Sequence, residues 1–239
     1  MASQPNPQIV SVGYNITPPF WMYLYALTAS LLIILPINKL YLHQKYKYHL
    51  NKSFFITDNY KYFKPKFRDT INNFVSNGKL IKDSRNTVKS FNIDNLKLNI
   101  KRFKKPNFFN KIIYNFFRST KAQRSFDYAK KLIELGIATP KPIFYYNKFK
   151  SGLIFQSFYC SENIDYDYDM EYVFENRQLI NRDQLLKEFT LFTHSLHENG
   201  IMFLDHSRSN TLIKKNNNGY TFYLIDLNRM RFKSLTLKE

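Results

Sequence analysis

The sequence predicts a two-lobed α+β fold that follows a single N-terminal transmembrane helix. Three observations support this prediction. An uncharged, apolar run near the start of the chain is long enough to cross a bilayer. Short strand-like segments precede one helix, and further strands precede a second, longer helix. The 239 residues suffice for one domain with an appendage, or for two lobes with a buried core.

The first part of the chain, residues 1–52, is expected to hold the membrane helix and a basic juxtamembrane segment. Residues 1–38 carry no charged side chain, and Phe20–Ile37 is an apolar run near the lower length limit of a transmembrane helix. Tyrosines and lysines follow the run, so the positive-inside rule places the N-terminus outside and everything after Lys39 in the cytoplasm. A buried hairpin or a start codon placed too far upstream would also explain the run.

Residues 53–156 are expected to form the first lobe. The segments "TVKSF" and "LKLNIKRF" have β-rich composition and are separated by the turn-like "NIDN", which predicts antiparallel strands. A helix is predicted to begin at Ser119 or Thr120 and to end at Gly136, with prolines beyond it. The segments "PIFYYN" and "GLIFQSFYC" then predict two further strands.

Residues 157–239 are expected to form a second lobe that lacks its last helices. The segment "NRDQLLKEFTLFTHSLHENG" predicts a long helix with Asp183 as its N-cap. Its buried stripe is expected to consist of Leu185, Phe189, Phe192 and Leu196. A loop with two polar residues, a strand, a turn "KKNNNG" and the strand "YTFYLID" follow.

The composition limits the classes of function. At 44% hydrophobic and 18% aromatic residues, the chain is not expected to be disordered. The single cysteine, Cys160, excludes an internal disulfide and a zinc site built on several cysteines. The formal charge of +18 favours an anionic partner such as nucleic acid, an anionic membrane or a phosphorylated substrate. A generally basic proteome rich in lysine and asparagine would give the same excess.

Three polar residues late in the chain have the spacing needed for phosphoryl transfer from ATP. In the protein-kinase arrangement a catalytic aspartate is followed five residues later by a metal-binding asparagine, and a second metal-binding aspartate ends a strand of the next hairpin. Asp205, Asn210 and Asp226 match this order. Lys101, in "LNIKRF", stands on the strand before the first helix, where a phosphate-binding lysine is expected. The structural alternative makes these residues turn formers and a strand terminator.

From about Asn77 to Phe232 the chain resembles the bacterial lipopolysaccharide kinases, which phosphorylate Kdo or heptose in the inner core, and most of all their short Bacteroidetes members. The resemblance is carried by "SRNTVKSF", "IKRFKKPN", "FFRSTKAQRSFDYAKKLIELGIATPKPI", "FLDHSRSNTLI" and "FYLIDLNRMRF". It implies a protein-kinase-like fold that binds ATP and Mg²⁺ between two lobes. It assigns the catalytic base to Asp205, the metal ligands to Asn210 and Asp226, and phosphate binding to Lys101.

Two further ATP contacts are expected from the same resemblance. Arg85, within "KDSRN", occupies the place of the glycine-rich loop and is expected to hold phosphates. The backbone near Ser157, Phe158 and Tyr159 is expected to face the adenine.

Several residues depart from the kinase pattern. Phe203 replaces a histidine two residues before the aspartate, and Asp-Leu-Asn replaces Asp-Phe-Gly at Asp226. The glutamate that pairs with the lysine is missing: Ser125 stands in its place, and Asp127 is a shorter substitute. The chain also ends soon after Asp226, so a truncated lobe is expected. These departures leave two alternatives open, a non-catalytic kinase-shaped binding module and a protein serine/threonine kinase.

The region from Lys101 to Arg124 interleaves basic and aromatic residues. This pattern fits an RNA-binding surface, a face that meets anionic lipid, or a solvated basic face over core aromatics. The apolar run favours lipid, so the expected partners are the lipid A–Kdo precursor and anionic lipid of a bacterial inner membrane, without nucleic acid. The kinase domain is then expected to face the cytoplasm.

Overall fold

The computed structural model describes residues 54–217 and 219–232, all within one compact unit, Tyr46–Glu239. The membrane helix predicted at Phe20–Ile37 lies outside the described residues. Within the described part of the chain, no helix combines the length and apolar character needed to cross a bilayer.

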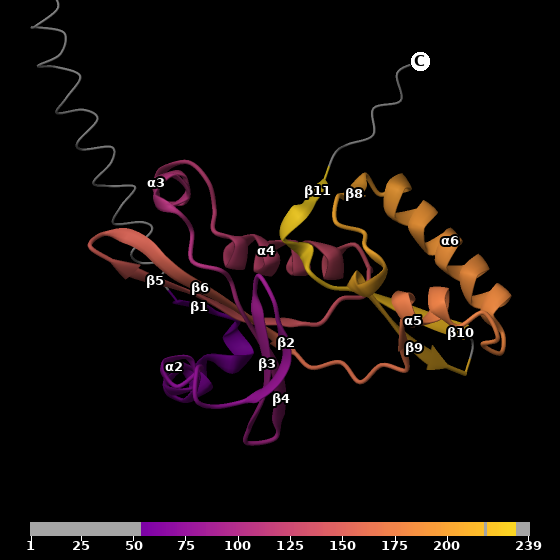
Figure 1. The fold of residues 1–239 in the computed structure, drawn as a ribbon, viewed down its shortest axis with the longest axis horizontal. Helices are drawn as coiled ribbons and strands as arrows, with labels where there is room; N and C mark the ends of the chain where they lie inside the picture. Colours follow the sequence, from indigo (N-terminus) through magenta and orange to yellow (C-terminus); the bar gives the residue numbers. More distant parts are fainter. Residues whose placement is uncertain (1–53, 218, 233–239) are drawn as a thin grey trace, which may run out of the picture. The chain divides into compact units, whose positions relative to one another are not determined.

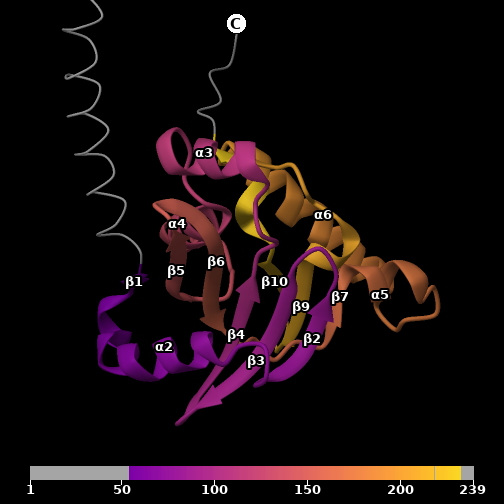
Figure 2. The same ribbon diagram turned by 60° about the vertical axis from the view of Figure 1, so that its left-hand side comes forward.

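A six-stranded antiparallel sheet forms the first half of the described chain (Figures 1 and 2). Its strand order is β1-β5-β6-β4-β3-β2. The strands are β1 (Phe54–Ile56), β2 (Lys79–Asp83), β3 (Thr87–Ile93), β4 (Leu96–Arg102), β5 (Pro142–Lys150) and β6 (Leu153–Glu162). The structure confirms the four predicted strands β3 to β6. The short strand β1 and the fully exposed strand β2 were not predicted separately.

One face of this sheet is covered by a 3₁₀ turn, η1 (Asp58–Phe63), and helix α2 (Lys64–Asn72). Phe67 and Ile71 of α2 are buried in a core with Leu98 and Phe144 of the sheet. Apolar side chains alternate along β3 and β4 because successive strand residues point to opposite faces. This packing holds β4 rigidly against the helix layer.

Helix α3 (Phe108–Phe116) and helix α4 (Lys121–Glu134) connect β4 to β5. Thr120 caps α4 by accepting a hydrogen bond from the Gln123 amide at 3.2 Å, and Gly136 follows the helix with φ of 73°. The predicted helix is therefore confirmed at both ends. Glycine at this left-handed position avoids the steric cost that a side chain would bring.

The second half begins with β7 (Tyr168–Asp169), α5 (Met170–Glu175) and the long helix α6 (Arg182–Glu198). It continues with β8 (Ile201–Phe203), η2 (Arg208–Asn210), β9 (Thr211–Asn216), β10 (Gly219–Leu224), η3 (Leu227–Arg229) and β11 (Met230–Phe232). Strands β10, β9 and β7 form one small sheet, and β11 pairs with β8. The strands predicted around "TLI" and "YTFYLI" are confirmed as β9 and β10.

The predicted N-cap of α6 is wrong. Asn181, not Asp183, is the N-cap, and it has the left-handed backbone angles φ 61° and ψ 21° without a side-chain capping bond. Asp183 instead lies in the first turn, where its negative charge interacts favourably with the helix dipole. The predicted stripe is confirmed, since Leu185 and Leu196 are buried and Phe189 and Phe192 pack against the cores.

Helix α4 joins the two halves of the described chain (Figure 1). On one side it contacts β5 and β6, and on the other it contacts η3. Ala129 and Leu132 share a buried core with Leu196, Leu224 and Leu227 of the second half. The helix therefore fixes where the end of β10 lies relative to the sheet.

Candidate active site

Lys101 and Asp226 meet in the structure. Lys101 lies near the end of β4, and Asp226 directly follows β10 and Ile225. The Lys101 Nζ is 2.7 Å from the Asp226 Oδ1, with side chains only 16% and 25% exposed. The two residues predicted to bind phosphate and metal thus come together from opposite halves of the described chain.

Asp226 has an unusual backbone conformation, with φ 58° and ψ 47°. For a residue other than glycine this left-handed conformation costs about 1–2 kcal/mol. The Asn228 Nδ2 donates a hydrogen bond of 2.6 Å to the Asp226 Oδ1, which helps to fix the carboxylate. Strain held by specific side-chain contacts is a feature of functional sites.

The electrostatics of the pair follow from burial and charge. Burial acts to raise the pKa of Asp226, but the ammonium of Lys101 outweighs it, and the pKa lies below its ordinary value. Burial lowers the pKa of Lys101, and the Asp226 carboxylate opposes only part of that shift. The arrangement therefore favours an ionised carboxylate at the point where a divalent cation is expected.

The loop that carries Asp205 and Asn210 is tied to the Asp226 segment. The Asn210 Nδ2 donates a hydrogen bond of 2.7 Å to the backbone carbonyl of Asp205. The Ile225 amide donates to the Asn210 carbonyl at 3.0 Å. The Asp205 Oδ1 lies 3.6 Å from the Arg229 Nη1. These contacts tie the loop of Asp205 and Asn210 to the segment that carries Asp226.

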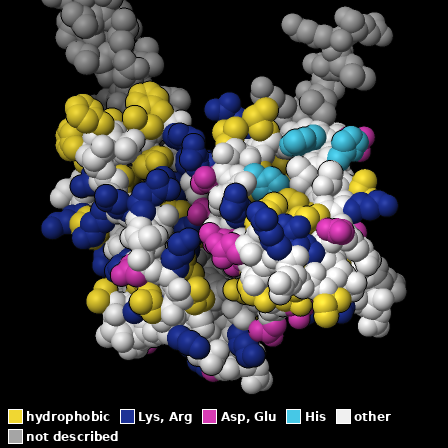
Figure 3. Space-filling model, turned by 45° about the vertical axis from the view of Figure 1, so that its right-hand side comes forward, with side chains coloured by type: hydrophobic (Ala, Val, Ile, Leu, Met, Phe, Trp, Pro, Cys, Tyr) yellow, Lys and Arg dark blue, Asp and Glu magenta, His cyan; other side chains and the backbone are white. Residues whose placement is uncertain are grey.

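Arginine and lysine side chains surround the pair. Arg85 lies in the turn between β2 and β3. Burial is the main cause that lowers the pKa of Lys101 and Lys121, and the charge of Arg85 adds to it. The same charge adds to the effect of Lys101 and Asn228 in lowering the pKa of Asp226. Arg124, largely buried on α4, donates from its Nε to the Asn228 carbonyl at 3.2 Å. Figure 3 shows basic side chains gathered over the middle of one face, beside a smaller acidic group. Such a concentration of positive charge suits a polyphosphate.

Four residues at the site were not predicted from the sequence: Lys121, Arg124, Asn228 and Arg229. Lys121 and Arg124 begin the predicted helix, and the other two directly follow Asp226 in "DLNR". Their basic or amide character next to predicted site elements was the available signal. Only the packing of α4 against η3 shows that they converge.

The structure corrects the adenine contact expected at Ser157, Phe158 and Tyr159. These residues lie inside β6, which pairs with both β5 and β4 along this stretch. The Ser157 carbonyl, for example, accepts from the Phe103 amide at 3.0 Å. Backbone groups within a sheet interior already have partners and are not free to bind a base.

The carboxylate that pairs with Lys101 is Asp226. Ser125, in the expected place of the missing glutamate, is buried and donates its hydroxyl to the Lys121 carbonyl at 3.0 Å. Asp127 lies on the exposed face of α4. Neither residue takes the position that the ion pair with Asp226 fills.

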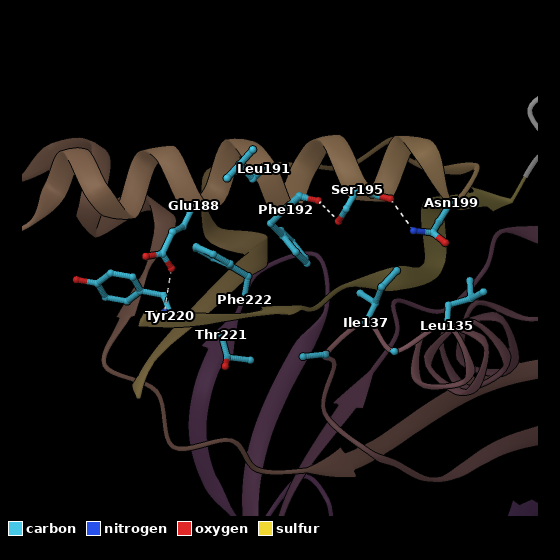
Figure 4. A pocket seen from close by; sticks show the side chains of 12 residues that line it. Leu135, Ile137, Glu188, Leu191, Phe192, Ser195, Asn199, Tyr220, Thr221 and Phe222 are labelled. Carbon is cyan, nitrogen blue, oxygen red and sulfur yellow. Dashed lines mark hydrogen bonds between the residues drawn. The ribbon is translucent and has the colours of Figure 1, made fainter. Parts of the chain in front are cut away.

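A cavity of about 490 Å³ has neither Lys101 nor Asp226 among its lining residues, and Figure 4 shows the side chains that line it. It is bounded by α6, β10 and the segment after α4, with Ile137, Phe192 and Phe222 as apolar walls. Glu188, which accepts from the Tyr220 amide at 3.1 Å, contributes a polar edge. None of the predicted site residues lines this cavity.

Comparison with known proteins agrees with this geometry. The family model of the lipopolysaccharide kinase (Kdo/WaaP) family matches residues 77–238, more than half of the chain. A search of curated protein sequences found no match.

Among solved structures, WaaP in complex with acyl carrier protein is similar at a TM-score of 0.53 and 15% identity, covering 75% of this chain and 73% of that chain. The Rio2 kinase complex with ADP/Mg²⁺ and phosphoaspartate from Chaetomium thermophilum matches at a TM-score of 0.47 and 14% identity, covering 70% and 52%. The likeness to WaaP shows a shared mixed α/β, kinase-like fold. Together with the family match, it establishes that the chain belongs to the lipopolysaccharide kinase (Kdo/WaaP) family, whose members are phosphotransferases.

Proposed function

We propose that this protein transfers the γ-phosphate of ATP to a sugar hydroxyl, Kdo or heptose, of the lipopolysaccharide inner core. The observation that carries the proposal is the contact of 2.7 Å between Lys101 and Asp226, beside the loop of Asp205 and Asn210. A cation, a carboxylate, an amide and a second carboxylate are the groups that phosphoryl transfer requires. Because ATP is cytoplasmic, the site would face the cytoplasm.

Asp205 is the group proposed to orient the acceptor hydroxyl and to accept its proton. Its side chain is 30% exposed, so an acceptor can approach it. Its ion pair with the half-exposed Arg229 is long, at 3.6 Å, and exposed pairs of this kind contribute little energy. An incoming hydroxyl could therefore displace Arg229 at small cost.

Lys101 and Arg85 are proposed to hold the phosphates of the nucleotide. Lys101 projects from a strand fixed on both sides by β3 and β6, so its ammonium is preorganised. Arg85 lies in a turn and can offer a bidentate contact to phosphate oxygens. Burial, and in smaller part repulsion from Arg85, lowers the pKa of Lys101 and of Lys121. Binding an anion here would relieve that repulsion.

The site suits Mg²⁺ held mainly by substrate. No cluster of three or more His, Cys, Asp or Glu side chains exists among residues 54–217 and 219–232. Magnesium commonly binds one or two protein oxygen ligands together with phosphate oxygens and water. The carboxylate of Asp226 and the Oδ1 of Asn210, whose amide nitrogen is already bonded, fit that donor set. A bound ion would neutralise phosphate charge during transfer.

The base of the nucleotide is proposed to lie against the segment that follows β6. There the chain leaves the sheet and runs through residues 163–167 to β7 without regular secondary structure. The amide of Asn163 still bonds to Lys97, but Ile164 to Tyr166 are outside the ladder. Their backbone groups are open to a base in the way that those of Ser157 are not.

The test is transfer of labelled γ-phosphate to a Kdo-containing lipid acceptor by the full chain with Mg²⁺. Asp205→Asn is expected to abolish transfer while leaving the thermal stabilisation by ATP and Mg²⁺ intact. Asp183→Asn, a matched change at an exposed aspartate of α6, is expected to retain full activity. Transfer that survives Asp205→Asn would refute the role of Asp205.

A non-catalytic, kinase-shaped binding module is the second candidate. The observation that favours it is that Asp205, the proposed catalytic base, already has Arg229 as an ion-pair partner. A ligand that binds the folded state raises its melting temperature. Absence of any shift with ATP and Mg²⁺ would favour this candidate over the kinase.

A further inference from the structure

Helix α3 carries an exposed apolar face. Phe108, Phe109 and Ile113 are 63%, 76% and 41% exposed. Phe109 and Ile113 are four residues apart and therefore share one side of the helix. Exposing several large apolar side chains on one short helix is costly in water and marks an interaction surface.

The helix itself is well defined. The Asn107 Oδ1 accepts a hydrogen bond of 2.9 Å from the Asn110 amide and so caps the first turn. Its other side faces the protein, because α3 contacts β6 and the Tyr114 ring lies 6.0 Å from the guanidinium of Arg124. The apolar face is thus held outward by packing on the opposite side.

Positive charge flanks this face. Lys104, Lys105 and Arg118 are exposed at the two ends of α3, and Lys111 lies within it. From Asn95 to Phe126 the sequence contains no acidic residue at all. Figure 3 shows apolar side chains standing out at the upper left of one face, above a group of basic side chains.

We propose that α3 docks this chain onto an anionic membrane surface. Aromatic and branched side chains would enter the boundary between headgroups and acyl chains, while the flanking lysines and Arg118 would meet anionic headgroups. A single-stranded nucleic acid could use the phenylalanines by base stacking. The aliphatic Ile113 on the same side gains from acyl chains and not from stacking, so the face as a whole favours lipid. The proposal does not depend on catalysis and would stand if the chain transferred no phosphate.

A fluorophore sensitive to polarity, attached at Phe109→Cys in the full chain, tests the proposal. The native Cys160 is buried at 0% exposure and will not compete for the label. In phosphatidylcholine vesicles that contain phosphatidylglycerol, emission from position 109 is expected to rise several-fold and to be shielded from aqueous iodide. A label at Tyr62→Cys, 85% exposed on a different surface, is expected to remain fully quenchable. This local readout is independent of how the rest of the chain is anchored.

Charge variants separate anionic lipid from other occupants. Lys104→Gln, Lys105→Gln and Lys111→Gln together are expected to remove most of the emission rise. Lys79→Gln, Lys187→Gln and Lys214→Gln change the net charge equally at exposed sites elsewhere and are expected to leave it unchanged. Equal iodide quenching at positions 109 and 62 in vesicles would overturn the proposal. Shielding of position 109 in the absence of lipid, by another copy or another segment of the chain, would also overturn the proposal. Shielding by a soluble acidic protein but not by vesicles would overturn it as well.

Discussion

Replacing Lys101 by methionine tests the central contact of the site. Methionine keeps most of the length and the apolar stem of the side chain and removes the ammonium group, with its charge and its hydrogen-bond donors. At 2.7 Å and an effective dielectric constant of about 20, the lost attraction to Asp226 is about 6 kcal/mol before desolvation is counted. Breaking a fully buried pair costs about 3–5 kcal/mol. Because Asp226 is 25% exposed and keeps its bond from Asn228, we expect a net loss of roughly 2–3 kcal/mol.

Thermal unfolding in detergent measures this loss. For a chain of this size, about 2–3 kcal/mol corresponds to a fall in melting temperature of roughly 4–12 °C. Lys97→Met, at an exposed lysine of the same strand, is the matched control and should change the melting temperature little. Removing Asp226 as well should cost less than the sum of the two single changes, because neither charge is then left unpaired.

The pH dependence of the same variant has a definite sign. The folded-state pKa of Asp226 is lowered, so its contribution to stability is present above about pH 3.9 and is lost as the pH falls through the folded value. In Lys101→Met the largest influence that opposes burial is gone, and only the Asn228 hydrogen bond and the charge of Arg85 still favour the ionised carboxylate. The Asp226 carboxylate therefore destabilises the variant at neutral pH, and protonation removes that cost. The gap in stability between wild type and variant should therefore narrow as the pH falls from about 7 towards 4. Equal melting temperatures for the Lys101 and Lys97 variants, or a gap that does not change with pH, would refute this reasoning.

Two further changes test contacts that support the site. The Tyr60 hydroxyl donates to Glu162 at 2.5 Å, and burial together with that carboxylate raises the tyrosine pKa to about 12. The protonated Tyr60 hydroxyl contributes its full stabilisation below about pH 10, and this stabilisation is lost as the pH rises through about 12. In Tyr60→Phe, the melting temperature measured at increasing alkaline pH should therefore fall less than in the wild type. Thr120→Val removes both the cap of α4 and the bond of 2.9 Å to the buried Asn147, and should cost about 2–3 kcal/mol in urea unfolding. Thr190→Val, at an exposed position of α6, should lower the free energy of unfolding far less. Equal losses for the two variants would contradict the importance of the cap.

Local chemistry explains which features the sequence could predict. Strands β3 and β4 follow from β-rich runs around a turn, and α4 follows from Thr120 at its start and Gly136 beyond its end. These signals depend on residues within a few positions of one another, so they can be recognised from the sequence alone. At the start of α6 two residues could each serve as the N-cap, and Asp183 was predicted although Asn181 is the N-cap.

The errors at the site come from long-range pairing. The family resemblance predicted that Ser157 faces a base, yet β6 pairs with β4 on one side and with β5 on the other. Nothing near Ser157 in the chain encodes which strands will flank it. The same holds for Arg229, whose guanidinium lies near Asp205 only in the folded chain.

The order of elements and the available chemical groups could be predicted from the chain, since backbone preference and side-chain type are properties of short segments. That Asp226, rather than a residue of α4, neutralises Lys101, and that α3 turns an apolar face outward, follows from the packing of segments far apart in the chain. Both outcomes depend on how α4 packs between the sheet and η3, where burial and charge from distant segments act together.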